Sequence, residues 1–362
     1  MLDRVLGPTQ WKWSDMSTPI ESDVIEITFG EAIRNAIAVA MRQDSRVIII
    51  GEDIAGGAGL GAPQEGSMGG SFGVTKGLLE EFGSSRVRDT PISEAGITSA
   101  AVGAAMAGLR PIVDLMWASF ALNCFDQIAN QAAKLRFMSG GQAQIPLVLR
   151  MAIGGGLRAA AQHSDTLYPL FTHIPGLKVV VPATAAEASG LLLAAIADDN
   201  PVIFLEHMSL YRVKGMVPLV PSQMPLGEIG IVRGGQDVTI ACVGNAVTIA
   251  LEAADVLVGD GIDAEVLSLR TLQPLDVEGL TASVERTTRL VIVEESPPRC
   301  SVSADIAATI GERLFGKLSA PIGRVNSGHS PVPFSPHLED AFLPSTSKIV
   351  DICRRVCTDT GS

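Results

Sequence analysis

Aromatic and charged residues are scarce in this sequence. Of its 362 residues, 4% are aromatic and 18% are charged, whereas 47% are hydrophobic. Glycine and alanine are abundant, which is typical of closely packed α/β layers and not of a disordered chain. The length suggests two domains, with enough apolar residues for large cores.

Clusters of basic residues and long apolar runs are both missing. The net charge is −12, and no cluster of Lys and Arg offers a surface for the phosphates of DNA or RNA. No run of 18 apolar residues resembles a membrane span, and the start of the chain has no apolar segment of the signal-peptide type. We therefore expect a cytoplasmic protein with no nucleic-acid partner and no membrane partner.

Motifs for metal binding and for a catalytic nucleophile are missing as well. The five cysteines are scattered, and Cys353 and Cys357 form a close pair without a second pair or a nearby histidine. The sequence contains no G-x-S-x-G and no H-E-x-x-H. We expect ordinary reduced thiols in a reducing compartment.

Strand and helix patterns alternate through the first part of the sequence. The strands are short and almost entirely apolar, as in parallel sheets that are covered on both faces. The pattern therefore predicts an α/β fold with a doubly wound parallel sheet. The expected strands are 46–50, 110–117, 145–153, 177–183 and 201–207, and the expected helices are Ile27 to about Met41, 125–138 and 184–198.

A change of pattern separates a second part. Residues 211–227 contain three prolines and no period, so we interpret them as a linker. Strand and helix patterns then resume, which predicts a smaller α/β domain at 228–362 after a larger one at 25–210. Residues 1–24 form an N-terminal extension, whose Trp11 and Trp13 we expect to dock on a neighbouring surface.

One glycine-rich loop fits a dinucleotide-binding fingerprint. Gly154, Gly156 and Ala159 match G-x-G-x-x-A after an expected strand. However, no helix pattern clearly follows, and the next strand ends in proline and threonine instead of an acid. The sequence thus disfavours a nicotinamide or flavin enzyme.

Segment 89–108 places one carboxylate, Glu94, before a run of apolar and small residues. Ser93 and Glu94 are also typical of a helix N-terminus, where a carboxylate is favoured. At helical spacing, small residues line one side of the expected helix, which permits close approach of a partner or plain core packing. These residues are Gly96, Ala100, Gly103, Ala104, Ala107 and Gly108.

The histidines fall in different settings. His163 lies among small residues near the glycine-rich loop, where its ring would be reachable. His173 and His207 flank expected strands, so we expect structural roles for them. His329 and His337 stand in a proline-rich stretch that we interpret as a surface loop.

Motifs along most of the chain resemble a known family. In order, they are GEDIAGGAG, GVTKGLLEEFG, RDTPISEAGITSAAVGAAMAGLRPIVDLM, FDQIANQAAKLRFMSGG, GLRAAAQHS, HIPGLKVVVPAT, AAIADDNPVIFLEH, LRTLQPLD and SPVPFS. From about Ile27 onward, they resemble the β subunit of the thiamine-diphosphate-dependent first component of 2-oxo acid dehydrogenase complexes. GEDIAGGAG, GLRAAAQHS and EESPPRCSVSADI look closest to the acetoin-cleaving branch. The alternatives are a pyruvate or branched-chain 2-oxo acid dehydrogenase β subunit and, from another class, a non-catalytic regulatory subunit.

The resemblance implies a transketolase-like fold, in which a pyrimidine-binding domain precedes a smaller C-terminal domain. It implies an α2β2 heterotetramer with thiamine diphosphate between α and β, and a lipoyl-bearing transacetylase that accepts the acetyl unit. In this family the α subunit holds magnesium and the diphosphate through a segment that runs from GDG to an Asn pair about thirty residues later. The GDG at 259–261 lacks such a pair and is better interpreted as a helix end and a turn.

The resemblance also implies roles for single residues. Glu94 matches the glutamate that hydrogen-bonds N1′ of the pyrimidine, which lets the cofactor's own 4′-amino group deprotonate the thiazolium C2. His163 matches a histidine near the thiazolium that is implicated in acyl transfer to the lipoyl group. The other implied pyrimidine contacts are Ile92, Met116, the stacking ring of Phe120, and Asn123, where much of the family has glutamine. The implied potassium ligands are Leu147, Ala195, Ile196, Asp198 and Asn200.

Overall fold

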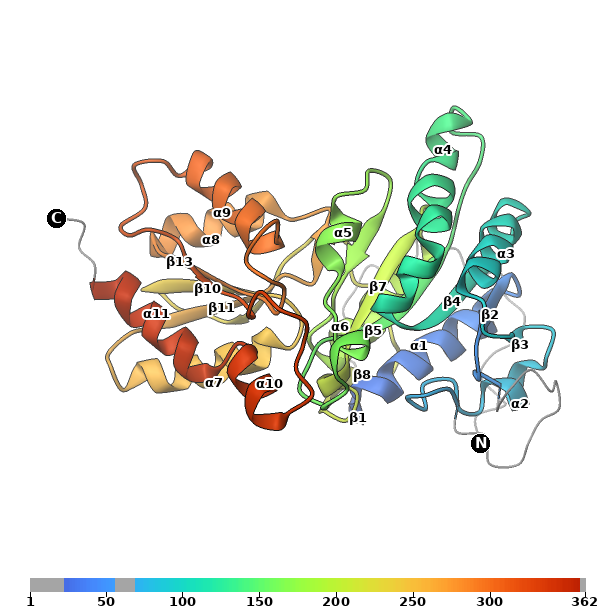
Figure 1. Cartoon of the computed structure of the whole chain (residues 1–362), viewed down its shortest axis with the longest axis horizontal. Helices are drawn as coiled ribbons and strands as arrows, with labels where there is room; N and C mark the ends of the chain where they lie inside the picture. Colours follow the sequence, from blue (N-terminus) through green and yellow to red (C-terminus); the bar gives the residue numbers. More distant parts are fainter. Residues whose placement is uncertain (1–22, 56–68, 359–362) are drawn as a thin grey trace.

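The computed structural model describes residues 23–55 and 69–358 of the chain. The expected docking of Trp11 and Trp13 concerns residues that lie outside this range. The described chain forms two α/β parts that lie side by side, each around its own sheet (Figure 1). In the described ranges, no helix is long and apolar enough to cross a membrane.

The first part is built on a seven-stranded sheet with the order β12-β6-β7-β5-β4-β2-β3. Its strands β2 to β7 pair in parallel, which confirms the expected parallel sheet. Strand β12 is antiparallel to β6 and comes from the second part of the chain, which the sequence pattern did not predict. The strands are β2 (Val47–Gly51), β3 (Val87–Asp89), β4 (Arg110–Trp117), β5 (Val148–Ile153), β6 (Lys178–Val180), β7 (Val202–His207) and β12 (Thr271–Gln273).

Helices cover both faces of this sheet, as expected of a doubly wound fold. Helices α1 (Phe29–Gln43) and α6 (Ala185–Ala197) pack against each other on one face. Helix α3 (Glu94–Met106) covers the other face with the helical turns that follow β4. The helix expected at 125–138 is interrupted, because a π-helical segment (Gln127–Ala132) precedes the short α4 (Leu135–Met138).

Two short strands correct the sequence-based boundaries. Strand β1 (Val24–Thr28) covers the expected start of the first helix, and β8 (Lys214–Pro218) lies in the stretch interpreted as a linker; they pair antiparallel. The Thr28 Oγ1 accepts the Glu31 N–H (3.2 Å), and the Glu31 carboxylate accepts the Thr28 N–H (2.8 Å). This capping box starts α1 at Phe29.

The second part is built on a five-stranded sheet with the order β14-β13-β10-β11-β9, in which only the edge strand β9 is antiparallel to its neighbour. Its strands are β9 (Gly230–Arg233), β10 (Val238–Cys242), β11 (Ala264–Ser268), β13 (Leu290–Val293) and β14 (Gly323–Val325). On one face lie α7 (Ala246–Val258) and α11 (Thr346–Thr358), and on the other lie α8 (Val277–Thr287) and α9 (Val302–Arg313).

Three short helices complete the described fold: α2 (Leu78–Phe82), α5 (Tyr168–Thr172) and α10 (Pro336–Phe342). Helix α7 ends at Val258 and Gly259 is its C-cap, as expected for the GDG sequence. The proline-rich stretch at 327–337 is irregular up to the start of α10, so the expected loop is shorter than the pattern suggested.

Candidate functional site

A small hollow, which we call the Glu94 hollow, lies at the carboxyl ends of β2 and β4. Glu94 is the first residue of α3. Because neighbouring parallel strands end at the same edge of a sheet, the residue after β2 and the last residues of β4 lie beside Glu94. The lining residues are Glu52, Ser93, Glu94, Ile97, Asp114, Leu115, Met116 and Phe120. The structure thus brings together three of the residues that the resemblance implied, Glu94, Met116 and Phe120.

All the charged side chains that line the Glu94 hollow are acidic. Glu52 was missed in the sequence analysis, although it stands in the GEDIAGGAG motif directly after a buried strand. Burial, followed by the negative charges of Asp53 and Glu94, raises the pKa of Glu52. Carboxylates among apolar side chains, without a lining Lys or Arg, suit a nitrogen-containing ring that shares a proton; they do not suit a diphosphate.

Strand β4 bulges where it borders the Glu94 hollow. Asp114 pairs with Arg150 of β5, and Trp117 pairs with Ala152, so β4 has one residue more than β5 between these pairs. Met116 in this bulge has φ of 64°, a left-handed conformation that costs free energy for a residue other than glycine. The Asp114 Oδ1 accepts the Met116 N–H at 3.0 Å. The bulge thus re-aims the Met116 side chain toward the hollow.

The His163 ring lies next to the Glu94 hollow. It makes edge-on contacts with the rings of Trp117 (4.7 Å between centroids) and Phe120 (5.7 Å). Phe120 therefore links His163 to the wall of the hollow. Ile92 is 74% exposed and Asn123 is exposed, and neither belongs to the lining residues.

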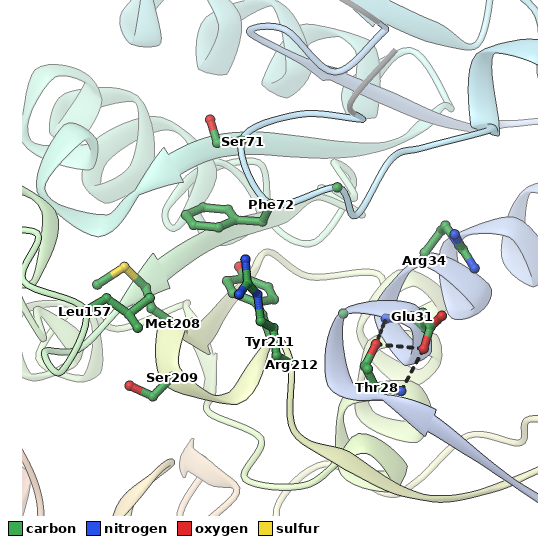
Figure 2. Close-up of a pocket in the computed structure, with 12 residues that line it drawn as sticks. Thr28, Glu31, Arg34, Ser71, Phe72, Leu157, Met208, Ser209, Tyr211 and Arg212 are labelled. Carbon is green, nitrogen blue, oxygen red and sulfur yellow. Dashed lines mark hydrogen bonds between the residues drawn. The ribbon is translucent and has the colours of Figure 1, made fainter. Parts of the chain in front are cut away.

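A larger hollow, of about 640 Å³, is lined by residues at the start of α1, in the segment before α2 and in the segment after β7 (Figure 2). Tyr211 and Phe72 line it with stacked rings, 4.6 Å apart at an interplanar angle of 16°. The Phe72 ring in turn contacts Trp117 edge-on at 5.0 Å. Figure 2 shows Leu157 and Met208 on one side of this hollow and Arg34 and Glu31 on the other.

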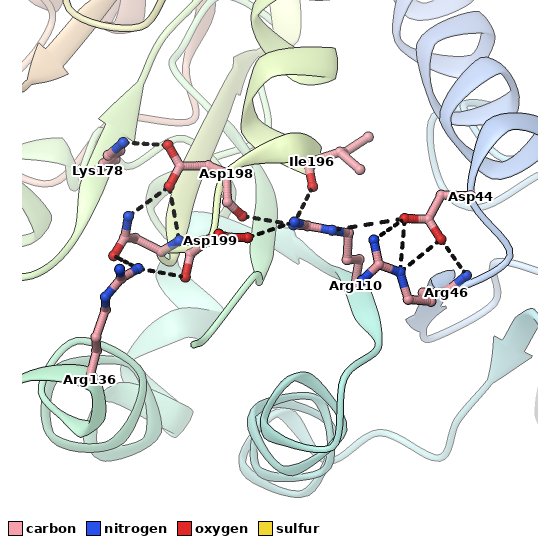
Figure 3. Close-up of polar contacts among 9 residues, drawn as sticks. Asp44, Arg46, Arg110, Arg136, Lys178, Ile196, Asp198 and Asp199 are labelled. Atoms are coloured by element: carbon pink, nitrogen blue, oxygen red, sulfur yellow. Dashed lines mark hydrogen bonds and ion pairs between the residues drawn. The ribbon is translucent and has the colours of Figure 1, made fainter. Parts of the chain in front are cut away.

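Four of the implied potassium ligands stand in the last turn of α6 or just after it, and Figure 3 shows two of them, Ile196 and Asp198. The Asp198 carboxylate is ion-paired with Lys178 and accepts the Asn200 N–H at 2.9 Å. Burial alone would raise the pKa of Asp198, but these partners together outweigh it and lower the pKa. The carbonyls of Ile196 and Asp198 accept bonds from Arg110 Nη1 (3.2 and 3.0 Å), so two cationic side chains already occupy this region. In the described ranges, no group of three or more His, Cys, Asp or Glu residues could hold a metal.

The glycine-rich loop at 154–156 contacts the second part of the chain. The Gly155 N–H donates to Glu295 (3.1 Å), and the Gly156 N–H donates to Glu339 (2.8 Å). The buried His207 also contacts Glu295, with Nε2 2.7 Å from Oε1, as suits its expected structural role. Because carboxylates already accept two of the loop's N–H groups and only a single turn of 3₁₀-helix follows, this loop does not form a phosphate cradle.

One side of α3 faces away from the sheet and is exposed. Gly96, Ala100, Gly103 and Ala107 are exposed, whereas the core side of the helix is buried. A Cβ added at Gly103 would meet no atom within 4 Å. Of the two roles left open for the small residues, core packing does not apply to these four, and the exposed side stays available for close approach of another surface.

Comparisons with known proteins agree with both parts of the fold. Residues 25–214 match the family described as "Transketolase, pyrimidine binding domain", and 227–349 match "Transketolase, C-terminal domain". A solved "Split gene transketolase, inactive beta4 tetramer" superposes with a TM-score of 0.72 at 21% identity, covering 92% of this chain and 99% of that one. At this identity, the likeness concerns the fold.

Two curated relatives narrow the family. The chain is 53% identical to the "Acetoin:2,6-dichlorophenolindophenol oxidoreductase subunit beta" of Bacillus subtilis, over 90% of this chain and 96% of the relative. It is 45% identical to the "Pyruvate dehydrogenase E1 component subunit beta" of Rickettsia felis, over 92% of this chain and 99% of the relative. The chain therefore belongs to the transketolase-like β subunits of thiamine-diphosphate-dependent dehydrogenase components, the family to which both relatives belong.

Proposed function

We propose that this chain is the β subunit of an enzyme that cleaves acetoin and transfers the two-carbon unit, as an acetyl group, to a lipoyl group. The observation that carries the proposal is the Glu94 hollow, where one carboxylate at a helix start lies among apolar side chains at the carboxyl ends of parallel strands. The 53% identity to an acetoin-oxidising relative supports this substrate.

The residue types that line the hollow suit the pyrimidine end of thiamine diphosphate, although its volume in the isolated chain is only about 10 Å³ and must widen when the ring binds. When bound, the cofactor supplies a nucleophilic thiazolium carbon and an electron sink for the cleaved carbon–carbon bond. Glu94 would hold a proton at N1′ of the pyrimidine, while Phe120 and Met116 would contact the ring and exclude water. His163, next to Phe120, would deliver a proton to the sulfur that departs when the lipoyl disulfide opens and its other sulfur bonds to the acetyl unit.

We infer that the other half of the site comes from an α subunit. The Glu94 hollow has no cationic lining for a diphosphate, so the partner holds the diphosphate and magnesium. The exposed small residues of α3 allow that partner to approach closely. The complete enzyme is an α2β2 heterotetramer served by a lipoyl-bearing transacetylase. All five cysteines are free thiols, including the exposed Cys300, as is typical of proteins in the reducing cytoplasm.

We also propose contacts that lie outside the hollow in the isolated chain. Ile92 and Asn123 reach the pyrimidine when the α subunit closes the site. A structural potassium ion is bound by Leu147, Ala195, Ile196, Asp198 and Asn200. It would share the carbonyls at the end of α6, the negative end of the helix dipole, with Arg110, which already donates to those of Ile196 and Asp198. The ion should raise the melting temperature in potassium chloride over that in sodium chloride at equal ionic strength; equal values would contradict it.

The substrate is tested on the reconstituted enzyme. The chain is co-expressed with an α subunit that carries the GDG-to-Asn-Asn segment, and reduction of 2,6-dichlorophenolindophenol is followed with acetoin, pyruvate and a branched-chain 2-oxo acid. We expect turnover of acetoin. Turnover of pyruvate but not of acetoin would favour the pyruvate branch, to which the 45% identical relative belongs. An assembly that turns over none of them would favour a regulatory subunit.

A further inference from the structure

A buried row of four polar side chains runs from the Glu94 hollow to the larger hollow. Arg150 is ion-paired with Asp114 at one end. On its other side it binds Glu206 through two parallel bonds, Nε to Oε1 (2.9 Å) and Nη2 to Oε2 (2.6 Å). The Tyr211 hydroxyl donates to the same Glu206 at 2.6 Å. Arg150 is 2% exposed and Glu206 is fully buried, so the middle of the row is shielded from water.

Such a row is a poor device for stability alone. Removing ions from water costs nearly as much free energy as their mutual attraction returns, so well-packed apolar side chains of similar volume would serve a core equally well. What the charges provide is direction, because two carboxylates fix the planar guanidinium of Arg150 from both sides. The question is what this fixed geometry positions.

At the Glu94 hollow, the row ends at Asp114, which contacts the backbone of Met116. Asp114 lies directly opposite Arg150 in the strand register, at the last regular pair before the bulge. One of its oxygens is held by Arg150, and the other accepts the N–H of Met116, the residue in the left-handed conformation. A strained residue persists only where its surroundings fix it, and here the Asp114 carboxylate does so.

We propose that Asp114 and Arg150 are positioning residues for the cofactor: they lock the β4 bulge so that Met116 forms a fixed wall of the Glu94 hollow. Both oxygens of Asp114 are engaged, so this carboxylate does not compete with Glu94 for the ring nitrogen. The inference rests on the proposed function, since it assumes that the hollow binds the pyrimidine of thiamine diphosphate.

The test compares Asp114→Asn and Arg150→Lys with a matched control in the assembled α/β enzyme. The amide introduced by Asp114→Asn keeps an oxygen for the Met116 N–H but loses the charge, and a lysine cannot bridge two carboxylates as arginine does. The control, Glu265→Gln, removes another fully buried carboxylate that is paired with an arginine, Arg286, but it stands in the second sheet. For each, the thiamine diphosphate concentration at half-maximal activity, kcat at saturating cofactor and the melting temperature are measured.

We expect Asp114→Asn and Arg150→Lys to raise the half-saturating cofactor concentration about tenfold, the equivalent of releasing one strained backbone residue. Their kcat at saturating cofactor should fall less than this concentration rises. Glu265→Gln should lower the melting temperature and leave the half-saturating concentration unchanged. If Arg150→Lys fails to assemble, Asp114→Asn alone decides.

The inference would be overturned if Asp114→Asn kept a half-saturating cofactor concentration within about a factor of two of the parent value while its melting temperature fell as in Glu265→Gln. A Glu94→Gln variant measured alongside distinguishes a failure of the positioning role from a failure of the proposed function. If Glu94→Gln is inactive while Asp114→Asn binds cofactor normally, only the positioning role fails. If Glu94→Gln keeps full activity, the proposed function itself fails.

Discussion

Helices α3 and α6 have the same length and are both rich in alanine, but their surroundings are opposite. Each has 13 residues, of which α6 buries ten and α3 buries five. Helix α6 lies between the sheet, α1 and β8, whereas α3 covers the sheet and leaves its small residues exposed. An apolar helix that folding leaves half open, beside a hollow at the strand ends, indicates a surface kept for a partner.

The largest effect should come from blocking the open side of α3. Gly103→Leu should leave the isolated chain folded, because the added side chain meets open space and glycine is the poorer helix former by about 0.5–1 kcal/mol. The same leucine should prevent close approach of the α subunit, and activity should be lost with assembly. Size-exclusion chromatography of the co-expressed subunits measures this.

A matched control for that experiment is Gly311→Leu. Gly311 also lies inside a helix, α9, and an added Cβ there would likewise meet nothing within 4 Å. We expect the Gly311→Leu chain to assemble normally. If both variants assemble equally well, the open side of α3 is not the subunit contact.

A substitution in the buried helix α6, Gly190→Ala, should affect folding and not assembly. A Cβ at Gly190 of α6 would lie 2.8 Å from the Met224 Cβ, so Gly190→Ala forces packed atoms apart. We expect a loss of about 1–3 kcal/mol in the free energy of unfolding, measured in urea. Gly103→Ala should not destabilise the isolated chain, and equal losses for the two variants would remove the contrast between the helices.

The first-turn glutamate of α6 should make stability depend on pH. Burial raises the pKa of Glu187, although its carboxylate accepts the Ala183 N–H (2.8 Å) and the Ser268 hydroxyl (3.1 Å). Between the unfolded value of 4.5 and the raised value, the folded chain binds more protons than the unfolded chain, so this group's contribution to stability falls as pH rises.

Glu187→Gln should remove that contribution. Relative to the variant, the parent should lose free energy of unfolding as pH rises from about 4.5 to neutrality, as urea titrations at several pH values would record. A difference between parent and variant that stays constant across this range would contradict the raised pKa.

The smallest expected effect concerns the two neighbouring glutamates of the hollow. The negative charge of Glu94 contributes to the raised pKa of Glu52. In Glu94→Gln, the pKa of Glu52 should therefore move down toward its ordinary value, which NMR titration of the glutamate carboxyl groups can follow. An unchanged Glu52 titration would mean that the two groups do not interact.

Local sequence patterns predicted the parallel sheet, its covering helices and the second α/β part, because buried parallel strands are short apolar runs. They missed β12, β1 and β8, whose pairings depend on distant segments. The capping box that sets the start of α1 is present in the sequence as Thr28 and Glu31, but the helical period alone does not show it.

For the site, family motifs identified Glu94, Met116, Phe120 and His163, which the structure brings together. Neither the bulge of β4 nor the link from Asp114 to Arg150 could be predicted, because both depend on the register of two strands whose paired residues lie 36 positions apart. Ile92 and Asn123 lie outside the hollow of the isolated chain, and their roles stay predictions that depend on the α subunit.

The central claim is that the Glu94 hollow is half of a thiamine diphosphate site. Its most direct test is kcat of Glu94→Gln in the assembled α/β enzyme, at saturating cofactor and acetoin, with assembly checked by size-exclusion chromatography. A loss of about 10²–10⁴-fold in kcat, with the assembly intact, is the predicted result. An assembled Glu94→Gln enzyme with the kcat of the parent would contradict the account.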